Sequence, residues 1–419
     1  MIVDFSVENF RSIKEMQTLS MSAASIVSKY KEVDERNLIK VSDKFSLLKT
    51  KAIYGANASG KSNLIKALVS FIAIVTKSVK DDSSLVQNIW PYRLSTETEN
   101  KPSYFQLTFI LNNVQYRYGF EATNKEIISE WLFGTPGKKE VPFFTREGLI
   151  VNVNERQFKE GHKIVAFYKE QDIGTIARNN ALFLTLVTLF NKGFAKDIVD
   201  YISTIIVVSG SHYGSEYSLF MQAEDAMNEG KKSNQIVELM KGSDIGISDI
   251  GKHEYQPDQD KEKRVLTTTL HRKYDANRKD AGYATLYMIN EESEGTKKMF
   301  ELSPMILQAL NENRPLIIDE FDTRFHPLLT KKIVELFNSD TNTGSQLIFA
   351  THDTNLLNAK LLRRDQISFV EKDKYGTSHF YTLAEFKGVR NDASFEKDYI
   401  AGRYGAIPFL GDFNSIFEG

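Results

Sequence analysis

The sequence predicts an α/β fold with a mixed central sheet, an antiparallel β subdomain and a helical lobe. Two apolar runs of strand length, Ala52–Tyr54 and Leu316–Ile318, each lead directly into polar residues, as buried strands of a central sheet do. From residue 104 to 122 two β-rich runs flank Asn112-Asn113, which is a turn signal for an antiparallel hairpin. Helical spacing takes over near 175–194.

The composition is that of an ordinary globular protein with room for one large core or two. A formal net charge of −2 gives no global attraction to nucleic acid or anionic lipid, so DNA is a weakly supported partner. The chain has no cysteine, which excludes disulfides and thiolate metal sites and suits a reducing cytosol. The longest apolar run, Ala181–Phe190, is half a membrane span and predicts a buried helix. We therefore expect a cytoplasmic protein without a membrane partner.

The stretch IYGANASGKSNLIKAL, residues 53–68, matches the phosphate-loop pattern G-x-x-x-x-G-K-[ST]. Its fixed positions are Gly55, Gly60, Lys61 and Ser62. An apolar strand precedes the loop, and apolar residues recur on one helical face behind it, at Leu64, Leu68, Phe71 and Val75. The glycines let backbone N–H groups cradle a β-phosphate, Lys61 brings a charge to the β- and γ-phosphates, and the Ser62 hydroxyl is a ligand for Mg²⁺. This pattern predicts binding of a nucleoside triphosphate with Mg²⁺.

The strand at 316–318 ends in Asp319 and Glu320. A carboxylate in this position orders Mg²⁺ through its waters, the role expected of Asp319, and Glu320 is the candidate base for the attacking water. Such a pair alone is more often a solvated strand end, but the apolar lead-in and the order relative to the phosphate loop favour the catalytic interpretation. A second strand, in SQLIFATHD, leads to His352, a candidate γ-phosphate contact. The chain shows no Asn-Lys-x-Asp element for guanine, and this order is that of ATP-binding-cassette ATPases. The predicted catalytic residues are therefore Lys61, Glu320 and His352.

The segment ESEGTKKMFEL lies just upstream of the acidic strand. Cassette ATPases place a Ser-Gly signature at a helix N-terminus, where it contacts the γ-phosphate held by the opposite subunit. Ser293 and Gly295 would take these parts, and a helix N-cap at Ser293 is compatible with them. Pro304 leaves open whether the helix is continuous or restarts at Ser303.

Six segments together resemble bacterial AAA-domain ATP-binding proteins related to RecF, SMC and the OLD-family ATPases, a group associated with phage defence and abortive infection. The segments are ENFRSIK, GANASGKSNL, ESEGTKK, LIIDEFDTRFHP, ATHDTNLL and the C-terminal LRRDQISFVEKD…GRYGAIP. The resemblance implies a P-loop NTPase of the ABC/SMC-head type without the long coiled coil.

The resemblance also implies site residues. It adds Asn57 and Asn63 of the phosphate loop to the nucleotide contacts, brings Arg11 near the phosphates and places Asp322 across a dimer interface. The glutamine of the Q-loop stays open among Gln87, Gln106 and Gln115, and the signature lacks the second glycine and the glutamine of transporters.

The motifs divide the chain into three parts. Residues 1–174 form an N-terminal ATPase lobe with the phosphate loop and an antiparallel β subdomain, and residues 175–290 a helical lobe with a variable insertion. Residues 291–419 carry the signature, the acidic strand, the switch histidine and the rest of the ATPase lobe. The polar stretch 209–290 is the expected place for a variable or mobile insertion and for a partner to engage.

The leading functional hypothesis is a Mg²⁺-dependent ATPase that closes as a homodimer, or within a higher homo-oligomer, and so controls a separate effector, a nuclease or toxin, in antiphage defence. No Asp-x-Asp metal site follows His352, so nuclease activity is expected from a partner chain. One alternative is a RecF-like DNA repair or maintenance ATPase, although the basic residues of DKEKR and LHRKYDANRK are interleaved with acids. Another alternative is an ATP-binding scaffold that holds a toxin inactive.

Overall fold

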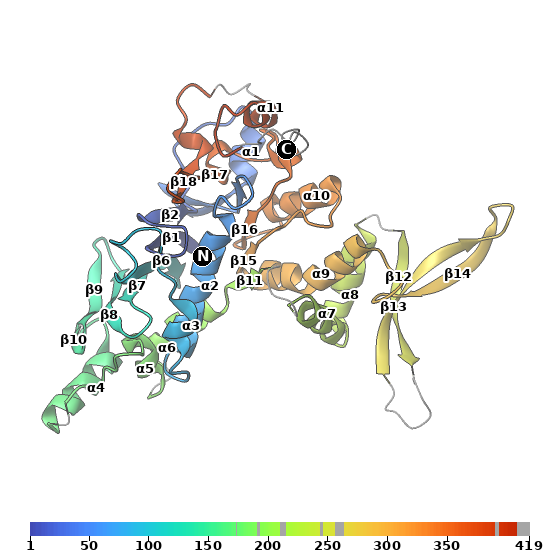
Figure 1. Ribbon diagram of the computed structural model, residues 1–419. Coiled ribbons are helices and arrows are strands. Elements are labelled where there is room, and N and C mark those ends of the chain that lie inside the picture. The colour runs from blue at the N-terminus through green and yellow to red at the C-terminus, as the bar shows by residue number, and fades with distance from the viewer. Residues whose placement is uncertain are drawn as a thin grey trace, which may run out of the picture.

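The computed structural model describes residues 1–172, 174–190, 193–209, 215–243, 246–255, 264–389 and 394–408. Figure 1 shows a body of two sheets and their helices, from which an arm of three strands extends. Within the ranges just given, no helix has both the length and the apolar character that a membrane crossing requires. The predicted fold class is confirmed, because the structure has a mixed central sheet, an antiparallel β subdomain and a helical lobe.

The mixed central sheet has six strands in the order β11-β15-β16-β5-β17-β18. Their bounds are β5 (Thr50–Tyr54), β11 (Ile206–Val208), β15 (Pro315–Ile318), β16 (Gln346–Ala350), β17 (Ile367–Lys372) and β18 (Ser378–Thr382). The first five strands in this order run parallel, and β18 is antiparallel. Ligands bind at the carboxyl ends of the strands in such sheets. The segments that follow β5, β15 and β16 therefore come together at one edge, as the motifs require.

Both faces of this sheet are buried, each against its own hydrophobic core. Alternate residues of the strands belong to different cores, because successive side chains point to opposite faces. The residues that β5, β15 and β16 contribute to the first core are Ile53, Ile317, Ile348 and Ala350. Those in the second core are Ala52, Tyr54, Leu316, Ile318, Leu347 and Phe349. The central sheet is thus the partition between two layers that differ in structure.

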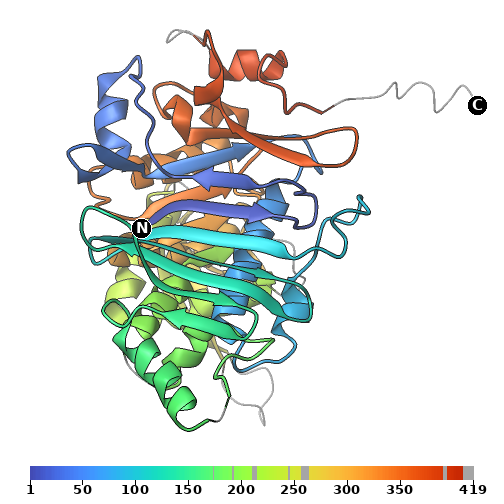
Figure 2. The same ribbon diagram turned by 90° about the vertical axis from the view of Figure 1, so that its left-hand side faces the viewer.

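The first layer is built on an antiparallel sheet in the order β10-β9-β8-β7-β6-β1-β2 (Figure 2). Its strands are β1 (Ile2–Glu8), β2 (Gln17–Ser20), β6 (Ser103–Leu111), β7 (Val114–Ala122), β8 (Ile127–Thr135), β9 (Val141–Glu147) and β10 (Ile150–Val153). The predicted hairpin turn is confirmed, because Asn112 and Asn113 join β6 to β7 with φ of 50° and 62°. Helices of this layer are α2 (Lys61–Lys77), α3 (Ser84–Asn88), α4 (Lys159–Glu170), α5 (Phe183–Thr188) and α6 (Phe194–Ser203).

The helix predicted in the run 181–190 is confirmed as α5, which is fixed to the β subdomain by a buried carboxylate. Glu130 on β8 accepts the N–H groups of Phe183 at 2.6 Å and Leu184 at 3.0 Å, the first turn of α5. Arg146 on β9 pairs with the same carboxylate at 3.4 Å, and both side chains are fully buried. Burial raises the pKa of Glu130, and Arg146 opposes that shift.

The second layer contains the helical lobe and the arm. Helices α7 (Ser215–Ala226), α8 (Gly230–Lys241) and α9 (Glu294–Glu312) pack together, and β12 (Ile247–Tyr255), β13 (Arg264–Tyr274) and β14 (Asp280–Tyr287) form the arm. Figure 1 shows the arm pointing away from both sheets. The described part of 209–290, expected as an insertion, is therefore folded into helices and a sheet. Residues 256–263, which hold most of DKEKR, lie outside the described residues.

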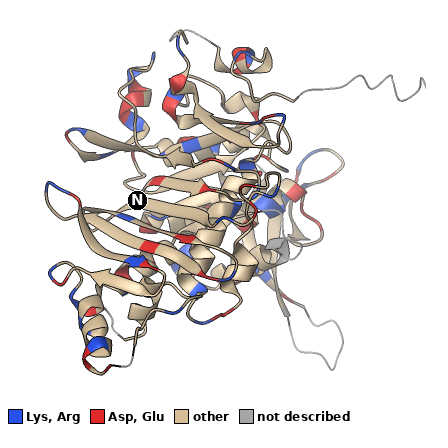
Figure 3. Cartoon of the chain, turned by 60° about the vertical axis from the view of Figure 1, so that its left-hand side comes forward, with Lys and Arg blue, Asp and Glu red and all other residues tan. Residues whose placement is uncertain are grey.

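The remaining elements are α1 (Lys31–Arg36), β3 (Leu38–Ser42), β4 (Phe45–Leu48), α10 (Pro327–Asn338), α11 (Phe395–Ile400) and the short helices η1 (Thr354–Leu356), η2 (Arg364–Gln366) and η3 (Leu383–Glu385). Of these, α10 and α11 contribute apolar residues to the second core. After His352 the chain forms the antiparallel strand pair β17 and β18. Charges of both signs are interspersed along the chain, consistent with its small net charge (Figure 3).

Candidate active site: a nucleotide phosphate loop and its neighbours

The phosphate loop joins the end of β5 to the start of α2, as predicted. Gly60 has φ of 117°, a conformation that L side chains rarely adopt, and a Cβ there would overlap Ser378 Oγ. A Cβ on Gly55 would overlap the carbonyl oxygen of Val370 in the neighbouring strand. The two glycines are therefore required by the close approach of β17 and β18 as well as by the shape of the loop. Asn57, at the tip of the loop, is exposed.

Lys61 is the buried positive charge of the loop. Its Nζ donates to the carbonyl oxygens of Gly55 at 2.7 Å and Ala56 at 3.1 Å, so the ammonium lies inside the curve of the loop. Burial lowers the pKa of Lys61, and the carboxylates of Asp319, Asp322 and Glu320 oppose that shift. The structure thus brings three predicted site residues within electrostatic reach of the predicted phosphate contact.

The acidic pair follows β15, two strands away from β5 in the central sheet. The Asp319 side chain is largely buried, and its backbone N–H donates to Val208 O at 2.8 Å. Glu320 has φ of 52° and its N–H donates to Asp319 Oδ1 at 3.1 Å. A left-handed non-glycine residue stores strain, which the neighbouring contacts must offset. The turn directs Glu320 to the exposed side of the strand end while Asp319 stays inside.

The predicted Mg²⁺ ligands, Ser62 and Asp319, fit a magnesium site of the phosphate-assisted kind. Mg²⁺ usually takes one or two protein ligands and completes its octahedron with water and substrate phosphate oxygens. Among the described residues no group of three or more His, Cys, Asp or Glu side chains could hold a metal without such help. The hydroxyl and the carboxylate therefore suit a metal that arrives together with a nucleotide.

Asp322, in the turn after the acidic pair, contacts the segment that carries His352 after β16. Asp322 Oδ1 accepts Thr351 Oγ1 at 2.6 Å and the backbone N–H of His352 at 3.0 Å. Burial lowers the pKa of His352, and the nearby Lys61 lowers it further. The structure thus ties Asp322 to the switch histidine of its own chain. A role for Asp322 across a dimer interface stays a prediction.

The signature segment begins α9. Ser293 is the N-cap, and its Oγ accepts the N–H of Thr296 at 3.1 Å, which confirms the capping interpretation. Helix α9 is continuous through Pro304. Proline cannot donate to the carbonyl four residues earlier, but Ser303 Oγ donates to Phe300 O at 2.8 Å instead. A Cβ on Gly295 would lie 3.0 Å from Arg324 O, so the segment packs closely against the turn after β15.

A lysine that the sequence patterns did not single out joins the signature helix to that turn. Lys298 Nζ donates to the carbonyl oxygens of Glu320, Phe321 and Thr323 at 3.1, 3.3 and 2.6 Å. Burial lowers the pKa of Lys298 to about 8. Its place one turn after Ser293, on the face of Gly295, is the sequence signal that could have indicated it. Signature and acidic turn form one connected unit.

A second link that the patterns missed joins the arm to the signature. Glu292, directly before Ser293, accepts from His271 Nε2 at 2.6 Å and contacts Thr269 Oγ1, both on β13. The Glu292 side chain is only 6% exposed. A carboxylate at this depth needs its partners, because an unpaired buried charge is costly. The base of the arm is therefore fixed to the residue that precedes the signature serine.

Arg11 lies in a turn after β1 that contacts the first turn of α2. The next residue, Ser12, accepts Asn63 Nδ2 at 2.7 Å. Arg11 has φ of 52°, donates its N–H to Trp90 O at 2.7 Å, and places its guanidinium 5.3 Å from the Trp90 ring centroid. Burial lowers the pKa of Arg11. Contact with a phosphate stays a prediction for Arg11.

The three glutamines considered for the Q-loop have different surroundings. Gln106 Oε1 accepts from Arg117 Nη1 and Trp131 Nε1, each at 3.1 Å, so it organises the antiparallel sheet. Gln87 lies on the exposed side of α3, and Gln115 lies on β7. The Q-loop assignment stays open.

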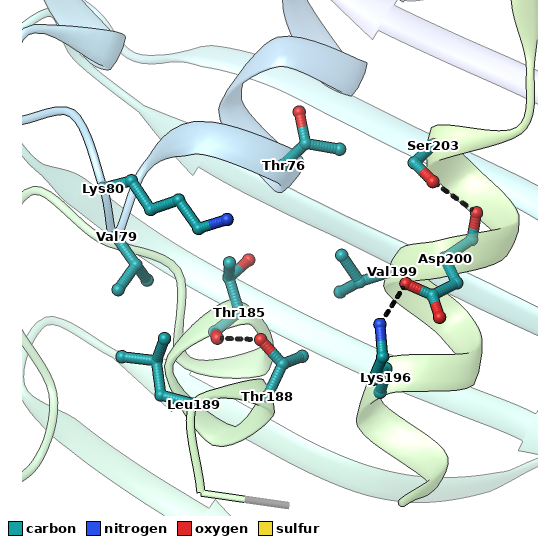
Figure 4. Close-up of a pocket in the computed structure, with 10 residues that line it drawn as sticks. All are labelled: Thr76, Val79, Lys80, Thr185, Thr188, Leu189, Lys196, Val199, Asp200 and Ser203. Carbon is teal, nitrogen blue, oxygen red and sulfur yellow. Dashed lines mark hydrogen bonds and ion pairs between the residues drawn. The ribbon is translucent and has the colours of Figure 1, made fainter. Parts of the chain in front are cut away.

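Figure 4 shows a separate cavity of about 230 Å³ between the C-terminal end of α2 and helices α5 and α6. It is roughly 20 Å along α2 from the phosphate loop, since Thr76 lies 15 residues after Lys61. Its charged pair, Lys196 and Asp200, is joined at 2.7 Å. No predicted site residue lines it, and we regard it as a packing gap rather than as part of the active site.

Three solved structures illustrate the similarity of the chain to known proteins. The SMC head domain from Thermotoga maritima is 12% identical with a TM-score of 0.42, covering 91% of this chain and 98% of that one. An SMC head bound to the C-terminal winged-helix domain of ScpA is 14% identical with a TM-score of 0.45, covering 91% and 97%. An SMC head with an extended coiled coil, bound to the C-terminal domain of ScpA from Pyrococcus furiosus, is 12% identical with a TM-score of 0.42, covering 96% and 98%. No curated protein matches the chain.

The family comparison covers the site just described. A profile described as "AAA domain, putative AbiEii toxin, Type IV TA system" matches residues 52–358, from β5 to the residues after η1. This range contains the phosphate loop, the signature, the acidic pair and His352. Since the match covers more than half of the sequence, this chain belongs to that family of AAA-domain ATPases.

Proposed function

We propose that the chain is a Mg²⁺-dependent ATP hydrolase whose ATP-driven homodimerisation regulates a partner effector in antiphage defence. The observation that carries this proposal is the convergence on Lys61 of Asp319, Glu320, Asp322 and His352. These residues come from the ends of adjacent parallel strands, which is where α/β sheets bind nucleotides. The family's AAA domain supports ATP as the nucleotide.

The chemistry assigned to these side chains follows from their positions. Bound Mg²⁺ would neutralise charge on the phosphate oxygens. Lys61, inside the loop, stabilises charge that develops on the β- and γ-phosphates, and Asp319 with Ser62 holds the metal. Glu320, exposed beside Asp319, orients and deprotonates the attacking water. Because burial and Lys61 lower the pKa of His352, this side chain is neutral at pH 7 and can donate one hydrogen bond to the γ-phosphate.

Dimerisation is proposed because the signature is displayed outward. Ser293 and Glu294 are exposed, and Ser293 is the N-cap at the start of α9. A second chain that contributes this helix end would complete the γ-phosphate contacts of the first chain. The assembly expected from such reciprocal contacts is a symmetric dimer with two nucleotides, or a higher homo-oligomer built from it.

Sedimentation tests the dimer. Glu320→Gln keeps the shape of the side chain and removes the base, so ATP with Mg²⁺ should convert this variant to a species of twice the mass. The matched control is Glu320→Gln with Lys61→Ala, which keeps the signature surface but lacks the phosphate contact and should stay small. A single mass for Glu320→Gln with and without ATP would contradict the proposal.

The regulatory role rests on what the described residues offer beyond the ATP site. They contain no metal-binding cluster, and the chain has no cysteine nucleophile. The family's description names a putative toxin of a type IV toxin–antitoxin system, which supports a link to growth control. The test expresses the chain with and without its genomic neighbour and challenges both strains with phage. Protection that needs the neighbour and is lost in Lys61→Ala supports regulation. Toxicity or DNA cleavage by the purified chain, persisting in Lys61→Ala, would contradict it.

A DNA-linked ATPase is the second candidate, and the end of the arm favours it. Arg272 and Lys273 precede Tyr274, and Tyr283 pairs across the hairpin with Arg272. Both tyrosines are more than half exposed, so Tyr274 in LHRKYDANRK and Tyr283 on the facing strand offer aromatic rings on which bases could stack. Fluorescence anisotropy with single- and double-stranded DNA at two salt concentrations tests this candidate. Tyr274→Ala with Tyr283→Ala should weaken binding, whereas Tyr375→Ala, exposed on the β17–β18 hairpin, is the control.

A further inference from the structure

The C-terminal GRYGAIP segment, residues 402–408, lies opposite the tip of the phosphate loop. The two segments enclose a cavity of about 510 Å³, together with the end of β17. Cavities of several hundred cubic ångströms are the usual size of small-molecule sites. Loop residues 56–59 form one wall, and the residues that form the other wall are Glu371, Lys372, Gly402, Gly405, Ala406, Ile407 and Pro408.

The wall opposite the loop is fixed by its own contacts. Tyr404 and Ala406 are buried in the second core. Tyr381 OH donates to Tyr404 O at 2.8 Å, and Tyr399 OH donates to Ala406 O at 3.1 Å. Gly405 has φ of 68°, and a Cβ there would lie 2.7 Å from Glu371 Oε2. The segment is therefore held in one shape, which is a property of binding sites and not of a loose surface tail.

An unpaired polar group lines the same cavity. The Ser59 hydroxyl is buried, the residue being 3% exposed, and its Oγ has no hydrogen-bond partner. Buried hydroxyls almost always have a partner, so this unpaired one is a polar group of the loop that lies beside the cavity and is free to bond. The residue lies directly before Gly60 and Lys61, so the cavity adjoins the part of the loop that is predicted to bind phosphate.

We propose that this cavity binds the nucleoside half of a nucleoside triphosphate, with residues 402–408 as the wall against which the base packs. The apolar surface of Ile407 and Pro408 suits the face of a flat heteroaromatic ring. Glu371 and Lys372 at the exposed rim provide one acceptor and one donor for ribose hydroxyls or base edges. This assignment rests on the proposed ATPase function and adds to it residues that lie outside the match to the family.

The test compares ATP with inorganic tripolyphosphate, each with Mg²⁺, by calorimetry. Tripolyphosphate keeps the phosphates and lacks the nucleoside. Wild-type protein should bind ATP more tightly than tripolyphosphate. Ile407→Trp fills the cavity and should weaken ATP binding at least about tenfold while tripolyphosphate binding is unchanged. Ile400→Trp, at an exposed position of α11, is the matched control and should bind both ligands as wild type does.

Unchanged ATP affinity in Ile407→Trp, or equal wild-type affinities for the two ligands, overturns the assignment. If Ile407→Trp binds neither ligand, the tryptophan has disturbed the phosphate loop. The same comparison is then made with Ile407→Ala, which leaves more space instead of less. Reduced ATP affinity with intact tripolyphosphate affinity in Ile407→Ala supports the assignment, and unchanged ATP affinity overturns it. Failure of the wild-type protein to bind either ligand would instead contradict the proposed ATPase function.

Discussion

The phosphate loop and the signature segment are built in opposite ways. The loop is held by several segments: Asn63 bonds Ser12, Ser12 bonds Ser378 at 2.7 Å, and Ser378 donates to Ser59 O at 2.6 Å. Ser12, Ser59 and Asn63 lie among the first 63 residues, whereas Ser378 belongs to the C-terminal part of the chain. The signature, in contrast, begins at the exposed Ser293.

The contrast follows from what each region must meet. A loop that binds a small anion works best when its amides are already in place, because ordering them on binding would cost affinity. A segment that contacts a second chain must be exposed. A few hydrogen bonds are then enough to fix it to the rest of its own chain. Lys298 and Glu292 are such links, one toward the acidic turn and one toward the arm. The predictions below test whether the two regions act separately.

The largest expected effect comes from the loop. Lys61→Ala should abolish ATP binding, since it removes the buried charge inside the loop. Glu320→Gln should retain ATP binding and lower kcat by about 100-fold or more, because only the general base is lost. Calorimetry measures the binding of ATP, and a steady-state phosphate-release assay measures kcat. Wild-type turnover in Glu320→Gln would show that the base is a different residue, and no turnover in wild type would favour the scaffold alternative.

The next effect tests whether the regions meet between chains. Lys61→Ala and Ser293→Arg should each be inactive alone. In an equal mixture, half of the dimers contain one of each, and each of these keeps one intact site, so about a quarter of wild-type activity should return. Mixing either inactive variant with itself is the control. No recovery, with mixed dimers verified by mass, would mean that Ser293 does not act on the partner's nucleotide or that one site does not suffice.

A smaller effect is expected at Lys298. Its pKa of about 8 lies below the ordinary value of a lysine, so the ammonium is intact at pH 7 and loses a proton, and with it one of its N–H donors, above about pH 8. Wild-type kcat should therefore fall above this pH, whereas Lys298→Arg, always charged, should stay flat.

Lys298→Met tests the same link without its charge. It should have a lower kcat at every pH, by about tenfold, with an unchanged KM because the phosphate loop is intact. A purely structural role would lower stability in Lys298→Met and leave the wild-type pH profile flat. The kcat profile from pH 6.5 to 9.5 and thermal unfolding of the three proteins separate these outcomes.

The smallest effect is expected at the base of the arm. His271→Ala and Glu292→Ala should each lower the free energy of unfolding by about 1–2 kcal/mol, since each removes the hydrogen bond between these two partly buried side chains. The double variant should lose less than the sum, by about 1 kcal/mol, because the two residues are in contact. If the arm influences the position of the signature, kcat of these variants should also fall two- to threefold. Strictly additive effects on stability would show that the contact contributes nothing.

Much of the site could be predicted from the sequence because its chemistry is local. The phosphate loop, the strand before it and the helix behind it lie within 28 consecutive residues, from Thr50 to Lys77. Asp319-Glu320 follow their own strand directly, and Ser293 caps the helix that it begins. Such segments carry both their conformation and their reactive groups in one short pattern.

The contacts that the sequence did not indicate are long-range. Lys298 is an unremarkable helical lysine until α9 is placed against residues 320–323, and Glu292 is one acid among several until β13 supplies His271. The arm itself appeared as a polar insertion, since β14 is largely exposed and the buried residues at the centre of β13 are the polar Thr267, Thr268 and Thr269.

What the sequence by itself determined is therefore the identity of the reactive groups, because the loop, the strand ends and the helix cap are each fixed by neighbours in the chain. What only the tertiary structure decided is which distant segments share a surface. The cavity between residues 56–59 and 402–408 depends on β17 lying beside β5, more than 300 residues later in the chain. Pairing of strands so far apart is set by the burial of whole faces of a sheet, and that burial is a property of the assembled core.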